Sequence, residues 1–187
     1  TFFEPDGENT FSGLIFCPTV NGYHGVVDTS DEVKSVIPST RIYAGSQPKK
    51  FGKINWDEAK RSNASSFKNN QITALVTTVA FGMGIDKPNI RWVVHYGLPK
   101  SIESYYQEVG RAGRDRREAQ CTLILTEFDE ARNQSLLSEA IDLETARTAN
   151  DVKKAAKDDV VQSMWFHLET YGGIEGEHLG LKEVASI

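Results

Sequence analysis

The stretch QEVGRAGRD, residues 107–115, places two arginines three positions apart, each beside a glycine. The apolar and aromatic residues at positions 102–109 predict a helix that leads into it. Arg111 and Arg114 then point the same way, and glycine leaves room for a close approach. Two planar, permanently charged guanidinium groups on one bare face are suited to bind a polyphosphate. The structural alternative is that the arginines pair with Glu108 and Asp115.

A second motif stands upstream, where residues 77–90 read TTVAFGMGIDKPNI. Together with SYYQEVGRAGRD at residues 104–115, it closely resembles motifs V and VI of the RecQ family of DNA helicases, which belong to superfamily two. The resemblance is continuous over residues 72–129, weaker over residues 13–71, and absent after residue 132. It implies the second RecA-like lobe of an ATP-driven enzyme that separates DNA strands or moves along them.

Composition sets limits on the class of protein. The chain has 187 residues, of which 39% are hydrophobic and 25% charged, as in ordinary globular proteins. The net charge of −5 excludes nucleic-acid binding by bulk charge, so any DNA contact must be local. Cys17 and Cys121 lie in apolar runs, are not part of a CxxC motif, and are expected to be buried, reduced thiols. We therefore expect no structural zinc.

The expected location is intracellular. No apolar run in the sequence reaches membrane-spanning length, and nothing resembles a signal peptide. The resemblance implies a cytoplasmic or nucleoid-associated protein in a bacterium and a nuclear protein in a eukaryote. The chain begins at Thr1 rather than at methionine, so we expect a piece of a longer protein.

Short apolar runs alternate with helical patterns along the first two thirds of the chain. Strands are expected at residues 13–18, 40–44, 72–77, 91–96 and 120–125. Helices are expected at residues 30–37, 56–67 and from residue 101 onward. This alternation is typical of an α/β fold in which helices cover both faces of a parallel sheet. With the resemblance, it predicts a RecA-like helicase C-terminal domain over residues 1–128.

The pattern changes after residue 128. Residues 129–170 contain neither proline nor glycine, and their apolar residues recur at helical spacing. Two helices are expected, separated by a break near residues 148–151 and ended by the glycines at 172 and 173. The sequence thus predicts a helical C-terminal appendage and tail over residues 129–187.

The resemblance assigns residues to an ATP site. It implies that Arg111 and Arg114 reach the nucleotide phosphates, with Arg114 stabilising charge on the transferred phosphoryl group. Gln107 would orient this arginine or contact the nucleotide. Asp86 would accept a hydrogen bond from the ribose or hold an arginine, and Gly84 would lie close to the nucleotide. For Asp86, the structural alternative is to cap the turn before the following proline.

The resemblance also implies a DNA-binding edge. Thr77, Thr78 and Gly82 match the part of motif V that follows the bound strand, and Thr19 stands where motif IV ends. Hydroxyls and backbone N–H groups bind phosphates without reading sequence. Alternatively, the two motif V threonines are ordinary strand-end residues. A basic edge or a solvated loop is expected at Lys49, Lys50 and Lys53.

Some expected parts are absent from the sequence. There is no GxxxxGK[ST] motif, so ATP and Mg²⁺ are expected to be bound mainly by an N-terminal RecA-like lobe of the same protein. Departures from the family include Thr19-Val20 in place of Ser-Arg, Arg116 in place of glycine, and the lack of a four-cysteine zinc region. The expected partner is single-stranded or partly duplex DNA. The alternatives are an RNA-dependent ATPase lobe and a non-catalytic protein-binding scaffold.

Overall fold

The computed structural model describes residues 3–22, 24–82, 86–99 and 101–125 of the chain. The chain divides into two compact units, Thr1–Ile124 and Leu125–Ile187. The helical appendage expected over residues 129–187 lies outside the described residues and stays a prediction. The first unit contains the sheet and every described element.

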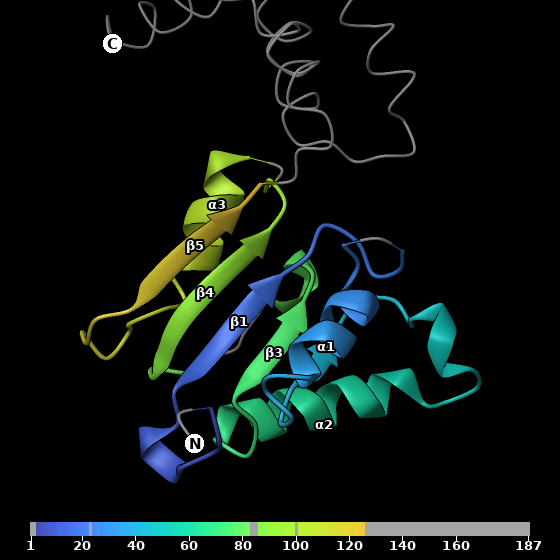
Figure 1. Ribbon diagram of the computed structural model, residues 1–187, viewed down its shortest axis with the longest axis horizontal. Coiled ribbons are helices and arrows are strands. Elements are labelled where there is room, and N and C mark those ends of the chain that lie inside the picture. The colour runs from blue at the N-terminus through green and yellow to red at the C-terminus, as the bar shows by residue number, and fades with distance from the viewer. Residues whose placement is uncertain (1–2, 23, 83–85, 100, 126–187) are drawn as a thin grey trace, which may run out of the picture. The chain divides into compact units, whose positions relative to one another are not determined.

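The first unit is built on five parallel strands (Figure 1). Their order across the sheet is β2-β3-β1-β4-β5. The strands are β1 (Ser12–Phe16), β2 (Arg41–Tyr43), β3 (Ala74–Thr77), β4 (Ile90–Tyr96) and β5 (Gln120–Ile124). All five correspond to predicted strands, and the predicted α/β parallel-sheet class is confirmed.

The described residues form three α-helices and three short 3-10 helices. They are η1 (Gly7–Asn9), α1 (Val26–Lys34), η2 (Lys49–Phe51), α2 (Trp56–Lys68), η3 (Val79–Gly82) and α3 (Ile102–Val109). Of these, η1 precedes β1 and the others lie between strands. α2 begins where the sequence predicted, because Asn55 accepts a hydrogen bond from the Glu58 N–H. α1 begins four residues before the predicted Ser30, because the valines at 26 and 27 are buried and extend the helical face. None of the described helices is long and apolar enough to span a membrane.

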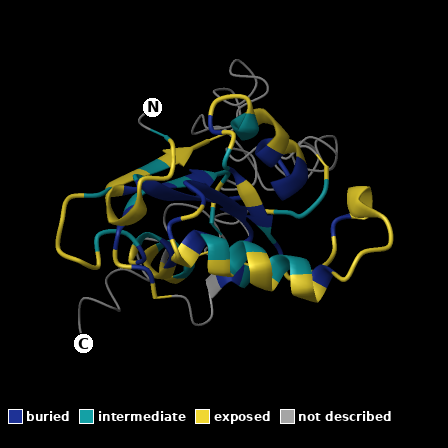
Figure 2. Cartoon of the chain, turned by 90° about the horizontal axis from the view of Figure 1, so that it is seen from below, coloured by how far each residue is buried: buried dark blue, intermediate teal, exposed yellow. Residues whose placement is uncertain are grey.

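The core has two layers, one on each face of the sheet. One layer joins Leu14, Leu75 and Val93 to Phe67 of α2 and to Phe81 of η3. The other layer joins strand residues such as Ile15 and Val76 to helix residues that include Val26 and Trp56. Because successive strand residues face opposite ways, β1 and β3 are buried on both faces, as the dark centre of Figure 2 shows.

The two cysteines, both expected to be buried, differ in exposure. Cys17 is buried, and burial raises the pKa of its thiol to about 11. Cys121 is exposed, so the expectation that both thiols are buried is wrong for this residue. The apolar run around Cys121 does form a strand, but that strand lies at the edge of the sheet.

A glycine and a tryptophan share one space between β1 and β4. The Trp92 ring lies over Gly13, where an added Cβ would stand 1.9 Å from ring carbons. The Trp92 indole N–H donates to the Phe11 carbonyl at 3.0 Å, which fixes the ring in this place. Gly13 is therefore required by its neighbour on β4.

We predict that Gly13→Ala destabilises the fold by about 1–3 kcal/mol or more, because the methyl group overpacks a closed space. Urea unfolding of the variant measures this cost. In a Trp92→Leu background the same substitution should cost much less. An equal cost in both backgrounds would contradict the proposed clash.

Candidate functional site

Residues 110–115, which carry Arg111 and Arg114 and are called the glycine–arginine turn, lie beside the amino end of β4. α3 starts at Ser101, whose hydroxyl accepts a hydrogen bond from the Ser104 N–H, and it runs back against the strand direction. The Gly113 N–H donates to the Ile90 carbonyl at 3.0 Å. Gly113 has a φ of +62°, and an added Cβ would meet a backbone oxygen at 2.8 Å. The turn therefore needs glycine at this position.

Arg114 is held on the surface by two acceptors. Its Nη1 lies 2.9 Å from the Asp86 Oδ1, and its Nε donates to the Gly110 carbonyl at 3.3 Å. Both side chains remain accessible, with 40% of the arginine and 81% of the aspartate exposed. The two motifs thus meet in space through a contact between Asp86 and Arg114.

Arg111 differs from Arg114 in its surroundings. Only 8% of Arg111 is exposed. Burial lowers its pKa, the charge of Arg114 acts in the same direction, and Glu108 opposes both. Arg111 therefore lies inside the turn, whereas Arg114 lies on its surface.

Asp115 fastens the turn to the sheet through Arg91. The two side chains form a two-pronged pair, with Nη1 and Oδ1 separated by 3.0 Å. Asp115 also accepts a hydrogen bond from the Arg117 N–H at 3.1 Å. The hydrogen bond to Arg91 lowers the pKa of Asp115 to about 2. Asp115 therefore pairs with Arg91, and not with Arg114 as the structural alternative expected.

A buried pair joins α3 to β4 just before the turn. His95 Nε2 and Glu108 Oε2 are 2.7 Å apart, and their side chains are 2% and 7% exposed. The His95 ring also stacks on Phe16 at 5.2 Å between centroids. His95 is thus a core residue, with its Nε2 paired to Glu108. Its partner Glu108 was not predicted, because a glutamate in a helix is usually at the surface.

A second buried polar cluster lies beside Asp86. Lys87 is 1% exposed, its ammonium group donates to the Asn70 amide oxygen, and its Nζ lies 5.1 Å from the Phe67 ring centre. Asn89 donates to the same Asn70 oxygen at 3.0 Å. Burial lowers the pKa of Lys87 to about 8. The cluster anchors the segment that carries Asp86.

The predicted DNA-binding residues occupy the opposite end of the sheet. Thr77 is fully buried, and its hydroxyl donates to the Thr78 carbonyl at 2.8 Å. The Thr78 hydroxyl accepts from the Ala80 N–H at 3.4 Å and is 9% exposed. Thr19 is half-buried and bonds to the Asn21 carbonyl at 3.2 Å. The Thr77 hydroxyl is therefore used in a hydrogen bond within the turn.

The remaining predicted residues are placed only in part. Gln107 is exposed on α3, and Gly82 ends η3. Gly84 lies outside the described residues. Over the described part of the chain, no group of three His, Cys, Asp or Glu side chains is placed to hold a metal ion.

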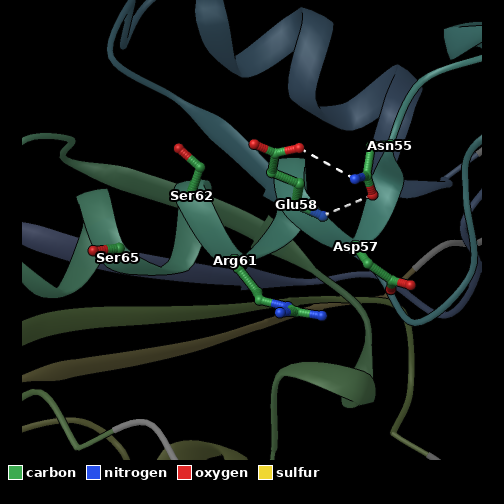
Figure 3. Close-up of a pocket in the computed structure, with 6 residues that line it drawn as sticks. All are labelled: Asn55, Asp57, Glu58, Arg61, Ser62 and Ser65. Carbon is green, nitrogen blue, oxygen red and sulfur yellow. Dashed lines mark hydrogen bonds between the residues drawn. The ribbon is translucent and has the colours of Figure 1, made fainter.

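A shallow pocket of about 500 Å³ lies along α2, away from these motifs (Figure 3). Its hydrogen bonds, from Glu58 N–H to Asn55 and from Asn55 to the Glu58 carboxylate, are those of the helix cap. None of the predicted site residues lines it. The lining residues are Asn55, Asp57, Glu58, Arg61, Ser62 and Ser65.

The chain was compared with known protein families, and the matching region contains both motifs. Residues 6–116 match the family described as the helicase conserved C-terminal domain. This match covers more than half of the chain, and the chain therefore belongs to that family. Within it, motifs V and VI and the relatives below identify the chain as a C-terminal lobe of the RecQ family of superfamily two helicases.

Three relatives illustrate the similarity. The chain is 46% identical to the RecQ-like DNA helicase blm-1 of Caenorhabditis elegans, over 44% of this chain and 8% of that protein. It is 48% identical to the ATP-dependent DNA helicase RecQ of Bacillus subtilis, over 39% and 12%. It is 35% identical to the RecQ helicase of Haemophilus influenzae, over 68% and 19%. The matched part is thus a small fraction of each relative's length.

We predict that the Arg91–Asp115 pair makes the free energy of unfolding depend on pH in the acid range. The pKa of Asp115 is lower in the folded state, so its contribution is complete above about pH 4 and is lost as the pH falls toward 2. Asp115→Asn should flatten this part of the pH profile in urea unfolding. An unchanged slope between pH 4 and 2 would show that the pair does not form in solution.

Lys87 should produce a dependence of the same sign at alkaline pH, where stability again rises with pH. Its folded-state pKa is lowered from 10.5 to about 8, so the unfolded chain binds more protons between these values and stability should rise with pH there. The contribution is roughly 2–3 kcal/mol at most. Lys87→Met, which keeps the chain length, should remove the rise. The difference between variant and parent isolates Lys87 from Cys17, whose raised pKa acts in the other direction.

Proposed function

We propose that the chain is the second RecA-like lobe of an ATP-dependent RecQ-like DNA helicase or translocase. The observation that carries this proposal is the exposed Arg114 guanidinium, which Asp86 and the Gly110 carbonyl orient outward from a glycine-rich turn. A guanidinium fixed in this way meets a phosphate without having to reorganise. The N-terminal lobe of the same protein is the proposed partner.

Among the described residues, Arg114 fits the phosphates of ATP, because it supplies positive charge at the surface. Mg²⁺ in such sites is usually held by one or two carboxylates together with the phosphates of the nucleotide. In this proposal the N-terminal lobe binds the metal ion and the bulk of the nucleotide, as the resemblance implies. ATP supplies the phosphoryl bond whose cleavage drives movement. This lobe alone should not hydrolyse ATP.

In this proposal Arg114 is the arginine finger, the side chain that stabilises charge on the transferred phosphoryl group. Arg111 supports it. Charge grows on the phosphate oxygens as the phosphoryl group is transferred, and a fixed guanidinium stabilises that charge. Arg114 is accessible for this contact. Arg111 is 8% exposed and acts electrostatically with Glu108 inside the turn, so it holds the turn in place and adds to the local positive potential.

The proposed DNA contacts lie at the carboxyl ends of the strands. Thr19 follows β1, and Thr78 with the backbone of η3 follows β3, which is the neighbour of β1 in the sheet. Single-stranded DNA would bind across this edge through its phosphates, without sequence preference. Because the chain carries a net charge of −5, the isolated lobe should bind weakly.

The test is Arg114→Ala and Arg114→Lys in the full-length protein. Both should lower kcat about 100-fold or more with a much smaller effect on the KM for ATP, because lysine keeps the charge but loses the two-pronged geometry. Arg117→Ala, which removes an equal charge three residues away, is the matched control and should keep kcat near wild type.

Thermal melts of each variant separate a loss of chemistry from a loss of fold. The Arg114 variants should melt close to wild type, because an exposed ion pair contributes little stability. If Arg114→Ala melts early and still turns over normally, the finger assignment fails.

A further inference from the structure

A lysine-rich turn follows β2 and has no assigned role. Lys49, Lys50 and Lys53 lie within residues 44–55, a segment without aspartate or glutamate. All three lysines are exposed. In a chain of net charge −5, this turn is a local concentration of positive charge.

The turn is fastened beside the loop that carries Thr19. The backbone N–H of Lys49 donates to the Asn21 side-chain oxygen at 2.9 Å, across 28 positions of sequence. The Lys50 ammonium group pairs with Asp31 of α1. Neither Lys49 nor Lys53 forms an ion pair with a described acidic residue. The Lys49 backbone bond therefore holds the turn in place, Lys50 is paired with α1, and the side chains of Lys49 and Lys53 present their charges to solvent.

An aromatic ring stands between these lysines. Phe51 is 37% exposed, and its ring stacks on Trp56 with centroids 6.1 Å apart and an interplanar angle of 13°. Trp56 is buried and donates its indole N–H to the Ala44 carbonyl at 3.0 Å. The ring of Phe51 is thus supported from one side by a fixed neighbour. Single-strand binding sites combine such rings, which stack on bases, with cations that bind the backbone.

We propose that residues 47–53 form a further binding site for single-stranded DNA, in which Lys49 and Lys53 bind phosphates and Phe51 stacks on a base. This inference rests on the proposed DNA-binding edge and lengthens it. β2, β3 and β1 are neighbours in the sheet, so the segments that follow them share its carboxyl edge. The bound strand then passes from Thr19 and η3 onto the lysine-rich turn.

The charge contribution is tested with Lys49→Gln/Lys53→Gln in the 187-residue chain. Fluorescence anisotropy with a labelled thymidine oligonucleotide of about 20 nucleotides is measured over a range of salt concentrations. The slope of log K against log salt should fall by about 0.7 for each phosphate that the variant no longer binds. The control is Arg41→Gln/Lys68→Gln, which removes the same charge at the amino end of β2 and at the carboxyl end of α2. It should leave the slope unchanged.

The stacking contribution is tested with Phe51→Leu, which keeps an apolar side chain beside Trp56. Affinity for the thymidine oligonucleotide should fall about fivefold or more. Affinity for an abasic oligonucleotide of the same length should not change, because its backbone still meets both lysines. A variant with a merely damaged fold would lose affinity for both probes.

Three outcomes overturn the inference. If wild type binds the oligonucleotide and the lysine and phenylalanine variants bind equally well, the DNA-binding edge stands but this turn is not part of it. A polyglutamate peptide is the second probe. If the Lys49→Gln/Lys53→Gln variant binds the oligonucleotide like wild type but binds the peptide more weakly, the turn is a site for an acidic protein. If wild type does not bind single strands at low salt, this inference and the proposed DNA contacts both fail, while the Arg114 kinetics remain a separate test.

Discussion

The hydrogen bond between His95 and Glu108 holds the last turn of α3 against β4. Both groups are buried, and a buried carboxylate without its partner is costly, so the helix cannot slide or rotate on the sheet without losing this bond. The turn that follows is then fixed on both sides, by the Gly113–Ile90 backbone bond and by the Arg91–Asp115 pair. Arg114 is the exposed group at the end of this series of contacts, and its position follows from them.

Much of the fold could be predicted from apolar runs alone, since β1 and β3 are buried strands and β4 is buried in part. The start of α1 was missed because its first turn, with Val26 and Val27, follows a glycine-rich segment without a polar cap. Cys121 was misplaced for a different reason. A strand at the edge of a sheet can carry the same apolar letters as a central strand, and only the topology tells them apart.

The contacts of the candidate site also fall into those that the sequence predicts and those that it does not. The meeting of Asp86 and Arg114 could be expected from the two motifs, since the resemblance already linked them. The partners of Glu108, Asp115 and Lys87 could not, because each depends on which polar groups the folded chain brings together after burial. Lys87 shows this most clearly, since its amide partner Asn70 is 17 residues away at the turn before β3. The sequence offers a lysine before a proline, which by itself predicts a solvated turn.

Motif V joins two ends of the sheet. Thr78 follows the carboxyl end of β3, whereas Asp86 stands before the amino end of β4, and eight peptide units connect them. A fully extended chain of that length reaches at most about 28 Å. The segment is therefore a short connection between the proposed DNA-binding edge and Arg114. If DNA binds as proposed, a displacement of Thr78 beyond that reach would also displace Asp86, the carboxylate that pairs with Arg114.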